Sequence, residues 1–235
     1  MSELFSIQLQ NQQQSRDGVW LDLPTTTEQV QAALRQIGIS SDNPQGLFIS
    51  GYFAEEEKRF AIPYNMVLAS SVDELNFLAA RLETLSAGER AELNAALQTP
   101  QGELSSIGRI TDFPENVEYY VHLPDVRGPV QLGDYYLNRS GMVDMPEEWK
   151  GGIDTAQFGR YVAQQEQGAF TQYGYLVKSG DEWQKVYEGQ PVPEEYRVLS
   201  FPASEILRDA ANIPPPVQPE TEPQKVIPII LNGKD

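Results

Sequence analysis

Alternation of apolar and polar residues marks the first part of the chain as rich in strands. It occurs over residues 4–10, and the apolar segments 19–23 and 47–52 are predicted to be two further strands. Between the last two segments, Thr25 and Glu28 have the spacing of a capping box, which opens a helix. The apolar residues of that helix recur at helical spacing: Val30, Ala33, Leu34 and Ile37. These patterns predict a small α+β unit.

The next stretch is helical. Ser71 with Glu74, and Ser86 with Glu89, have the spacing of two further capping boxes. The helix after the first box carries apolar residues at helical spacing, namely Leu75, Leu78, Ala79, Leu82 and Leu85. The helix after the second box carries Ala91, Leu93, Ala95, Ala96 and Leu97. Residues 104–110 have the pattern of one more short helix.

Strands and helices mix again from residue 111 onward. The predicted strands are at 117–121, 169–170, 173–177, 183–187 and 196–201. The predicted helices are at 130–138, 154–164 and 203–210, with a short helical turn at 145–149. Asp154 is placed to cap the helix that it begins. Beyond residue 212 prolines recur, a composition typical of extended polyproline segments, and an apolar patch follows at 226–231.

The patterns predict an α+β fold class organised as three small domains in series with a Pro-rich C-terminal tail. The predicted units are an N-terminal α+β domain at 1–62, a helical middle domain at 63–110, a C-terminal α+β domain at 111–212 and the tail at 213–235. A chain of 235 residues is long enough for two or three small domains. We expect the tail to be disordered, because its composition buries too little surface to offset the entropy of ordering.

Composition excludes several kinds of site. The formal net charge is −17, and ordinary nucleic-acid binding needs clustered Lys and Arg on a basic surface. The chain has no cysteine and one histidine, which excludes disulfides, thiolate zinc sites and a multi-histidine metal site within one chain. We therefore expect no cofactor and no metal. The N-terminus lacks a signal-peptide pattern and no apolar stretch is long enough to span a bilayer, so we expect a cytoplasmic protein without a membrane partner.

The negative charge is spread along the chain, and every predicted domain carries a net negative charge. One interpretation is a solvated acidic surface, which favours solubility. The other is that the carboxylates imitate the phosphates of a DNA duplex, because acids at positions i and i+4 of a helix lie about 6 Å apart, comparable to the phosphate spacing. Composition alone does not choose between them.

Motifs of catalysis are weak. Glycine-rich phosphate loops and the nucleophile elbow are absent, so we expect the single histidine, His122, to be structural or merely exposed. Adjacent acids occur at 55–57, 147–148, 181–182 and 194–195. A glycosidase needs two carboxyl groups about 5–9 Å apart in an aromatic cleft. A carboxylate-pair hydrolase is therefore an alternative, although adjacent acids on loops are usually solvated.

Three groups of motifs point to a family. The first comprises GVWLDLP at 18–24, VQAAL at 30–34 and IGI at 37–39. The second comprises SVDELNFLA at 71–79, LS at 85–86 and ERAE at 89–92. The third comprises LGDYY at 132–136, MPE at 145–147, ID at 153–154, FGRY at 158–161, GAFT at 168–171 and GY at 174–175. In this order they resemble the three parts of ArdA-type antirestriction proteins, over about residues 4–178.

The resemblance implies an elongated, curved α+β protein that dimerises through its last domain. It also implies a non-catalytic inhibitor, carried on mobile genetic elements, that mimics bent B-form DNA in the DNA groove of type I restriction–modification enzymes. The family's antirestriction motif corresponds to the region from Asp134 to Asp154. The expected partner-binding acids are Asp134, Asp144, Glu147, Glu148, Asp154, Glu115, Glu118 and Asp125. An ArdA-like interaction protein with a different protein target is the main alternative to a DNA mimic.

Overall fold

A computed structural model describes residues 4–13, 18–40, 44–56, 59–99 and 104–199. All of them belong to one compact unit of the chain, which extends to Ser200. The predicted helix at 203–210 and the Pro-rich tail at 213–235 lie outside the described residues.

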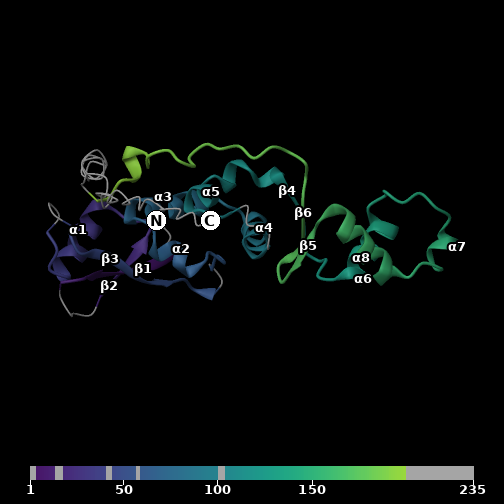
Figure 1. The fold of residues 1–235 in the computed structure, drawn as a ribbon, viewed down its shortest axis with the longest axis horizontal. Helices are drawn as coiled ribbons and strands as arrows, with labels where there is room; N and C mark the ends of the chain where they lie inside the picture. Colours follow the sequence, from purple (N-terminus) through teal and green to yellow (C-terminus); the bar gives the residue numbers. More distant parts are fainter. Residues whose placement is uncertain (1–3, 14–17, 41–43, 57–58, 100–103, 200–235) are drawn as a thin grey trace, which may run out of the picture. The chain divides into compact units, whose positions relative to one another are not determined.

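The first sheet is antiparallel and has the strand order β2-β1-β3 (Figure 1). Its strands are β1 (Phe5–Asn11), β2 (Val19–Leu23) and β3 (Leu47–Phe53), which confirms the three predicted strands. Every second residue of β1 is buried, so one face of the sheet packs on the core. The pairing of β1 with β3 shifts by one residue at Gln8 and Leu9, which marks a β-bulge.

Helix α1 (Thr27–Gln36) begins one residue later than predicted. Its cap is Thr26, which forms a capping box with Gln29, so the prediction of Thr25 with Glu28 was wrong. Thr25 is instead held by tertiary contacts: its backbone N–H donates to Asn76 Oδ1 at 2.7 Å. Thr25 and Thr26 each have a Glu or Gln three residues later, as a capping box requires. The contact of Thr25 with Asn76 in a distant helix leaves Thr26 as the residue that caps α1.

Four helices follow: α2 (Tyr64–Leu68), α3 (Val72–Glu83), α4 (Ala87–Gln98) and α5 (Ile107–Thr111). The predicted capping boxes at Ser71 and Ser86 are both confirmed, each with its glutamate three residues on. Such caps satisfy backbone N–H groups that a helix end otherwise leaves free.

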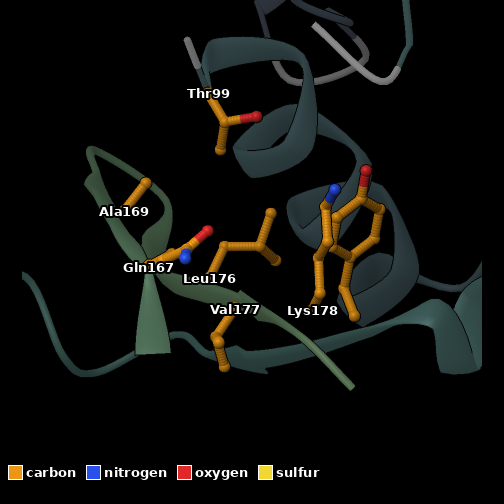
Figure 2. A pocket seen from close by; sticks show the side chains of 7 residues that line it. Thr99, Gln167, Ala169, Leu176, Val177 and Lys178 are labelled. Atoms are coloured by element: carbon orange, nitrogen blue, oxygen red, sulfur yellow. The ribbon is translucent and has the colours of Figure 1, made fainter. Parts of the chain in front are cut away.

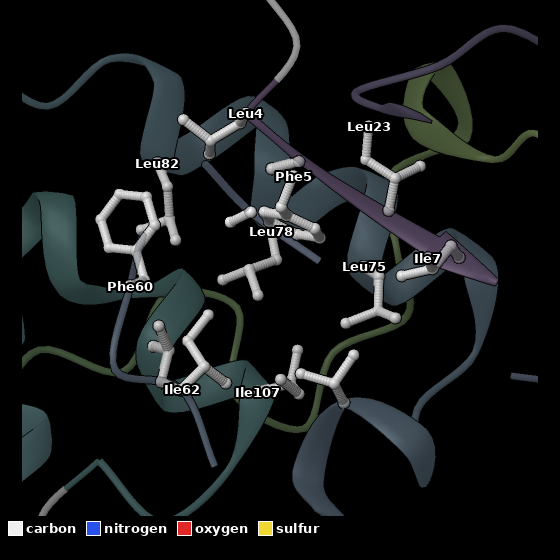
Figure 3. Close-up of a cluster of buried hydrophobic side chains, with 14 of the residues drawn as sticks. Leu4, Phe5, Ile7, Leu23, Phe60, Ile62, Leu75, Leu78, Leu82 and Ile107 are labelled. Atoms are coloured by element: carbon white, nitrogen blue, oxygen red, sulfur yellow. The ribbon is translucent and has the colours of Figure 1, made fainter. Parts of the chain in front are cut away.

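One buried hydrophobic cluster joins the first sheet to these helices (Figure 3). Figure 3 shows side chains of β1 and its neighbours facing those of α3 and α5, including Leu4, Phe5, Ile7, Leu23, Phe60, Ile62, Leu75, Leu78, Leu82 and Ile107. The same cluster contains Tyr120, Leu176 and Val198. Residues from all three predicted domains therefore share this core, and the division at 62 and 110 stays a prediction.

The last part of the described chain holds a second antiparallel sheet and a helix pair. Its strands are β4 (Tyr120–Leu123), β5 (Ala169–Thr171) and β6 (Gly174–Lys178), in the order β4-β6-β5. Three short 3-10 helices occur in this part of the described chain: η2 (Phe113–Glu115), η3 (Val117–Tyr119) and η5 (Glu194–Tyr196). The α-helices are α6 (Pro129–Asp134), α7 (Glu147–Lys150) and α8 (Thr155–Glu166), and α6 continues into the π-helix η4 (Tyr135–Arg139). Asp154 caps α8 as predicted.

Three predicted strands were wrong in whole or part. Residues 117–119 form a 3-10 turn, so the strand begins only at Tyr120. Residues 183–187 and the described part of 196–201 form no strand. Their backbone N–H groups pair with side chains of other elements instead of a neighbouring strand: Asp112 Oδ1 accepts from Tyr187 at 2.7 Å, and Asp73 Oδ1 accepts from Val198 at 2.8 Å. Alternating sequence cannot reveal such side-chain partners.

Candidate partner-binding surface

Two glycines bring helices α6 and α8 into backbone contact. A Cβ placed on Gly159 would lie 1.8 Å from the carbonyl oxygen of Pro129, and one on Gly133 would lie 2.0 Å from that of Thr155. Neither position has room for a larger residue unless the helices separate. The LGDYY and FGRY segments, where these glycines occur, therefore act first as the packing surface of a helix pair.

A carboxylate shared by two tyrosines ties this helix pair to the second sheet. Glu166, at the end of α8, accepts hydrogen bonds from the hydroxyl of Tyr136 in η4 and, at 2.9 Å, from that of Tyr175 in β6. Burial and the neighbouring Glu166 raise the pKa of both phenols, so each keeps its proton and donates. Gly168 leaves room for the Tyr175 ring, because a Cβ there would lie 2.0 Å from its hydroxyl oxygen. The helix pair is a rigid support for the acids on its surface.

Three of the predicted binding acids within the segment 134–154 are engaged within the chain. Asp134, at the end of α6, accepts from Asn138 at 2.8 Å and from Arg139 Nη2 at 2.6 Å, and these hydrogen bonds lower its pKa. Glu147 in α7 forms an ion pair with Lys150 at 2.6 Å, although the glutamate side chain is 83% exposed. Asp154 accepts the backbone N–H of Gln157 at 2.9 Å as the cap of α8.

Three others face solvent on the same region. Asp125 follows β4, Asp144 lies in the loop before α7, and Glu148 lies in α7; all three are exposed. Within the described part of the chain none of them pairs with a lysine or arginine. Over 134–154 the chain holds five acids and two bases, a net charge of −3. Because Arg139 and Lys150 neutralise their partners, the net charge resides mainly on acids outside the ion pairs.

Glu115 and Glu118 lie beside an open hollow of about 560 Å³. Asp181 and Glu182, from the segment after β6, line the same hollow together with Tyr119 and Trp183. Glu115 is neutralised by Arg81, whose Nη2 lies 2.6 Å from its carboxylate. In the sequence, residues 181–182 stand out only as an adjacent pair of acids. Its place beside Glu118 depends on tertiary contacts that spacing does not show.

Buried polar side chains hold that acidic segment in place. Asp112, which is fully buried, accepts the backbone N–H of Tyr187 at 2.7 Å and of Glu188 at 3.2 Å. Asn116 both accepts the N–H of Gln184 at 2.7 Å and donates to its carbonyl at 2.9 Å. Buried polar groups of this kind are costly unless paired, so the two side chains fix the course of the backbone after Asp181 and Glu182.

Other features limit the chemistry that the surface can perform. In the described ranges, no three Asp, Glu or His side chains converge to hold a metal ion. A pocket between Thr99 and strand β6 has a volume of about 20 Å³, enough for about one water molecule (Figure 2). His122 Nε2 lies 2.9 Å from the carbonyl oxygen of Tyr173, to which it donates, a structural contact. No helix of the described part is long and apolar enough to cross a membrane.

Comparison with known proteins identifies the family. A family model described as "Antirestriction protein (ArdA)" matches residues 13–177, which is more than half of the chain. No curated protein matches the sequence. Members of this family are antirestriction proteins that act on restriction enzymes and are in general not catalysts. The matched residues include strands β2 and β3 of the first sheet, helices α1 to α8 and the second sheet nearly to its end, whereas strand β1 precedes them. The chain therefore belongs to the ArdA antirestriction protein family.

Proposed function

We propose that this protein is a non-catalytic antirestriction protein that mimics B-form DNA and blocks the DNA-binding groove of type I restriction–modification enzymes. The observation that carries the proposal is the set of exposed carboxylates that no cation of the described chain neutralises: Glu118, Asp125, Asp144 and Glu148. Family membership supplies the antirestriction role. A groove built to bind phosphates presents lysines and arginines, which these carboxylates complement.

The ion pairs distinguish acids whose charge is free to bind a partner from acids whose charge is already neutralised. Glu115, Asp134 and Glu147 are each within 2.6 Å of a cationic nitrogen, so a partner must displace Arg81, Arg139 or Lys150 to use their charge. Exposed ion pairs contribute about 0–1 kcal/mol, so displacement is possible but reduces the gain. We infer that all eight predicted acids belong to the mimicking surface and that the acids outside ion pairs contribute most to binding.

We also propose a homodimer that joins two copies through their C-terminal regions into an elongated mimic. Exposed apolar side chains on the helix pair and its loops support this, because an interface would remove their apolar surface from water. These residues are Val130, Met142, Trp149 and Tyr161. Solution scattering and sedimentation at several concentrations test the dimer; a compact monomer at all concentrations would contradict it.

Two rival functions are tested by the same experiment as the proposal. An ArdA-like protein with a different target would use the same scaffold on another partner. A carboxylate-pair hydrolase is favoured only by the hollow that brings Glu118, Asp181 and Glu182 near Trp183. The three acids are exposed, whereas a general acid of a glycosidase usually gains its high pKa from an apolar pocket.

Binding to a purified type I restriction–modification complex, with duplex DNA as competitor, separates these functions. The proposal predicts tight binding that unmethylated duplex displaces, because both ligands occupy one groove. Binding that duplex leaves unchanged would favour the interaction protein. Glycoside hydrolysis that the single change Glu118→Gln abolishes would favour the hydrolase, because an enzyme depends on individual groups and a mimic on their sum.

A further inference from the structure

The outward face of the first sheet exposes aromatic side chains. Trp20 is 49% exposed and Phe53 is 56% exposed, and both point away from the buried face, which Leu21 and Ile7 help to form. Phe48, on the same outward face, is also exposed. Isolated exposed apolar residues are ordinary, but adjacent aromatic side chains on one sheet face indicate a binding surface.

The indole of Trp20 lies across the sheet. Trp20 in β2 pairs with Gln8 in β1, which pairs in turn with Gly51 in β3. A Cβ on Gly51 would lie 3.1 Å from Trp20 Cη2, although a whole strand separates the two residues. Strands are about 4.8 Å apart, so the ring reaches Gly51 only by extending over Gln8 along the surface. Gly51 is buried beneath it. One face of the indole thus rests on the sheet and the other faces solvent.

Two further side chains border this exposed ring. Phe53 meets Trp20 edge to face, with ring centroids 6.4 Å apart and planes at 74°. Asp22, two residues after Trp20 on the same face of β2, is exposed, and its carboxylate accepts the Ser6 hydroxyl at 2.6 Å. No lysine or arginine of the described chain pairs with Asp22. Residues two apart on a strand are about 7 Å apart, so one ligand group can contact both the ring and the carboxylate.

We propose that this face binds an arginine side chain of a partner protein, the guanidinium stacking on Trp20 and pairing with Asp22. A planar guanidinium stacks on an indole and also matches a carboxylate, whereas a lysine ammonium does not stack. The net charge of −17 opposes a phosphate-bearing ligand. This inference does not depend on DNA mimicry. In mimicry carboxylates take the place of phosphates, whereas here an indole ring stacks on the partner's guanidinium, a contact that a phosphate cannot make.

Titration with short peptides tests the proposal on the full chain. The probes are acetyl-Gly-Arg-Gly-amide and its neutral citrulline counterpart, followed by NMR at the Trp20 indole N–H and the Gly51 backbone N–H. We expect saturable shifts with the arginine peptide and about 2- to 30-fold weaker binding of the citrulline peptide, the range of a cation–π contact. The indole N–H of Trp149, which belongs to the proposed dimer interface and not to this sheet, is observed in the same spectrum and should shift less.

Variants sharpen the outcome. Asp22→Asn should weaken binding of the arginine peptide about 2- to 5-fold, and Trp20→Leu, followed at Gly51, should abolish saturation. Glu195→Gln, which removes an exposed acid outside every proposed site, should leave the affinity unchanged. Equal shifts with both peptides, or shifts at Trp149 that match those at Trp20, would overturn the proposal. So would concentration-dependent shifts of Trp20 without peptide, because they would show that a second copy covers this face.

Discussion

Replacing the buried carboxylate of Asp112 should loosen the segment that carries Asp181 and Glu182. Asp112 is fully buried and accepts two backbone N–H groups, from Tyr187 at 2.7 Å and Glu188 at 3.2 Å. Asp112→Asn keeps one acceptor oxygen but sets an NH₂ donor against the other N–H group. Hydrogen bonds to charged acceptors contribute about 1.5–3 kcal/mol, and a buried donor left unpaired costs about 1–3 kcal/mol. We expect a loss of about 2–3 kcal/mol in the free energy of unfolding.

Urea unfolding and amide hydrogen exchange measure this effect. With a slope of about 2–3 kcal/mol per molar urea, the midpoint should fall by about 1 M. Exchange should accelerate at Tyr187 and Glu188 more than in α3. Glu118→Gln, which removes an exposed carboxylate beside the same hollow, is the matched control and should leave the midpoint unchanged. A midpoint for Asp112→Asn equal to that of the unaltered protein would refute the anchoring role assigned to this carboxylate.

Three further outcomes are expected. Gly159→Ala should lower the melting temperature, because its Cβ would lie 1.8 Å from the Pro129 carbonyl oxygen, whereas Gly151→Ala, with no atom within 4 Å, should not; equal melting temperatures would contradict the close helix packing. Burial raises the pKa of Glu92 to about 7, so the folded chain binds more protons and stability should fall as pH rises from about 4.5 to 7. Urea unfolding at pH 4.5 and pH 7 should show that the free energy of unfolding falls less in Glu92→Gln than in the unaltered protein. An equal fall in the two proteins would exclude Glu92 as the source of the pH dependence. Deleting 213–235 should leave the melting temperature and inhibition unchanged, and loss of either would show that the tail is needed.

Local signals predicted most of the secondary structure. The capping boxes at Ser71 and Ser86 and the alternation in β1 depend on neighbours in sequence, and all three are confirmed. The wrong predictions concern segments whose backbone groups are bonded by side chains far away in the sequence. Asn76 engages Thr25 and leaves Thr26 as the cap of α1, and Asp112 engages amides that alternation had assigned to a strand. These contacts connect residues far apart in sequence, and no periodic pattern records them.

The candidate surface divides in the same way. That the acids of the α6–α8 region are largely exposed follows from their polar loops and helix ends, and the sequence predicted it. The sequence did not reveal every ion pair that neutralises one of these acids. Lys150, three residues after Glu147, is a helical neighbour that spacing reveals, but Arg81 reaches Glu115 only through the packing of α3 near η2. The stacking surface of Trp20 likewise depends on strand pairing and on the absence of a side chain at Gly51.

The salt dependence of binding to a type I restriction–modification complex tests the central claim most directly. Two matched sets of amide substitutions should be compared: Asp125, Asp144 and Glu148, which form no ion pair in the described chain, and Glu115, Asp134 and Glu147, which do. Mimicry predicts affinity that falls steeply with salt, because many ion contacts form together. It also predicts that the first set weakens binding and flattens the salt dependence more than the second. Affinity independent of salt, or inhibition lost with one acid alone, would contradict the account.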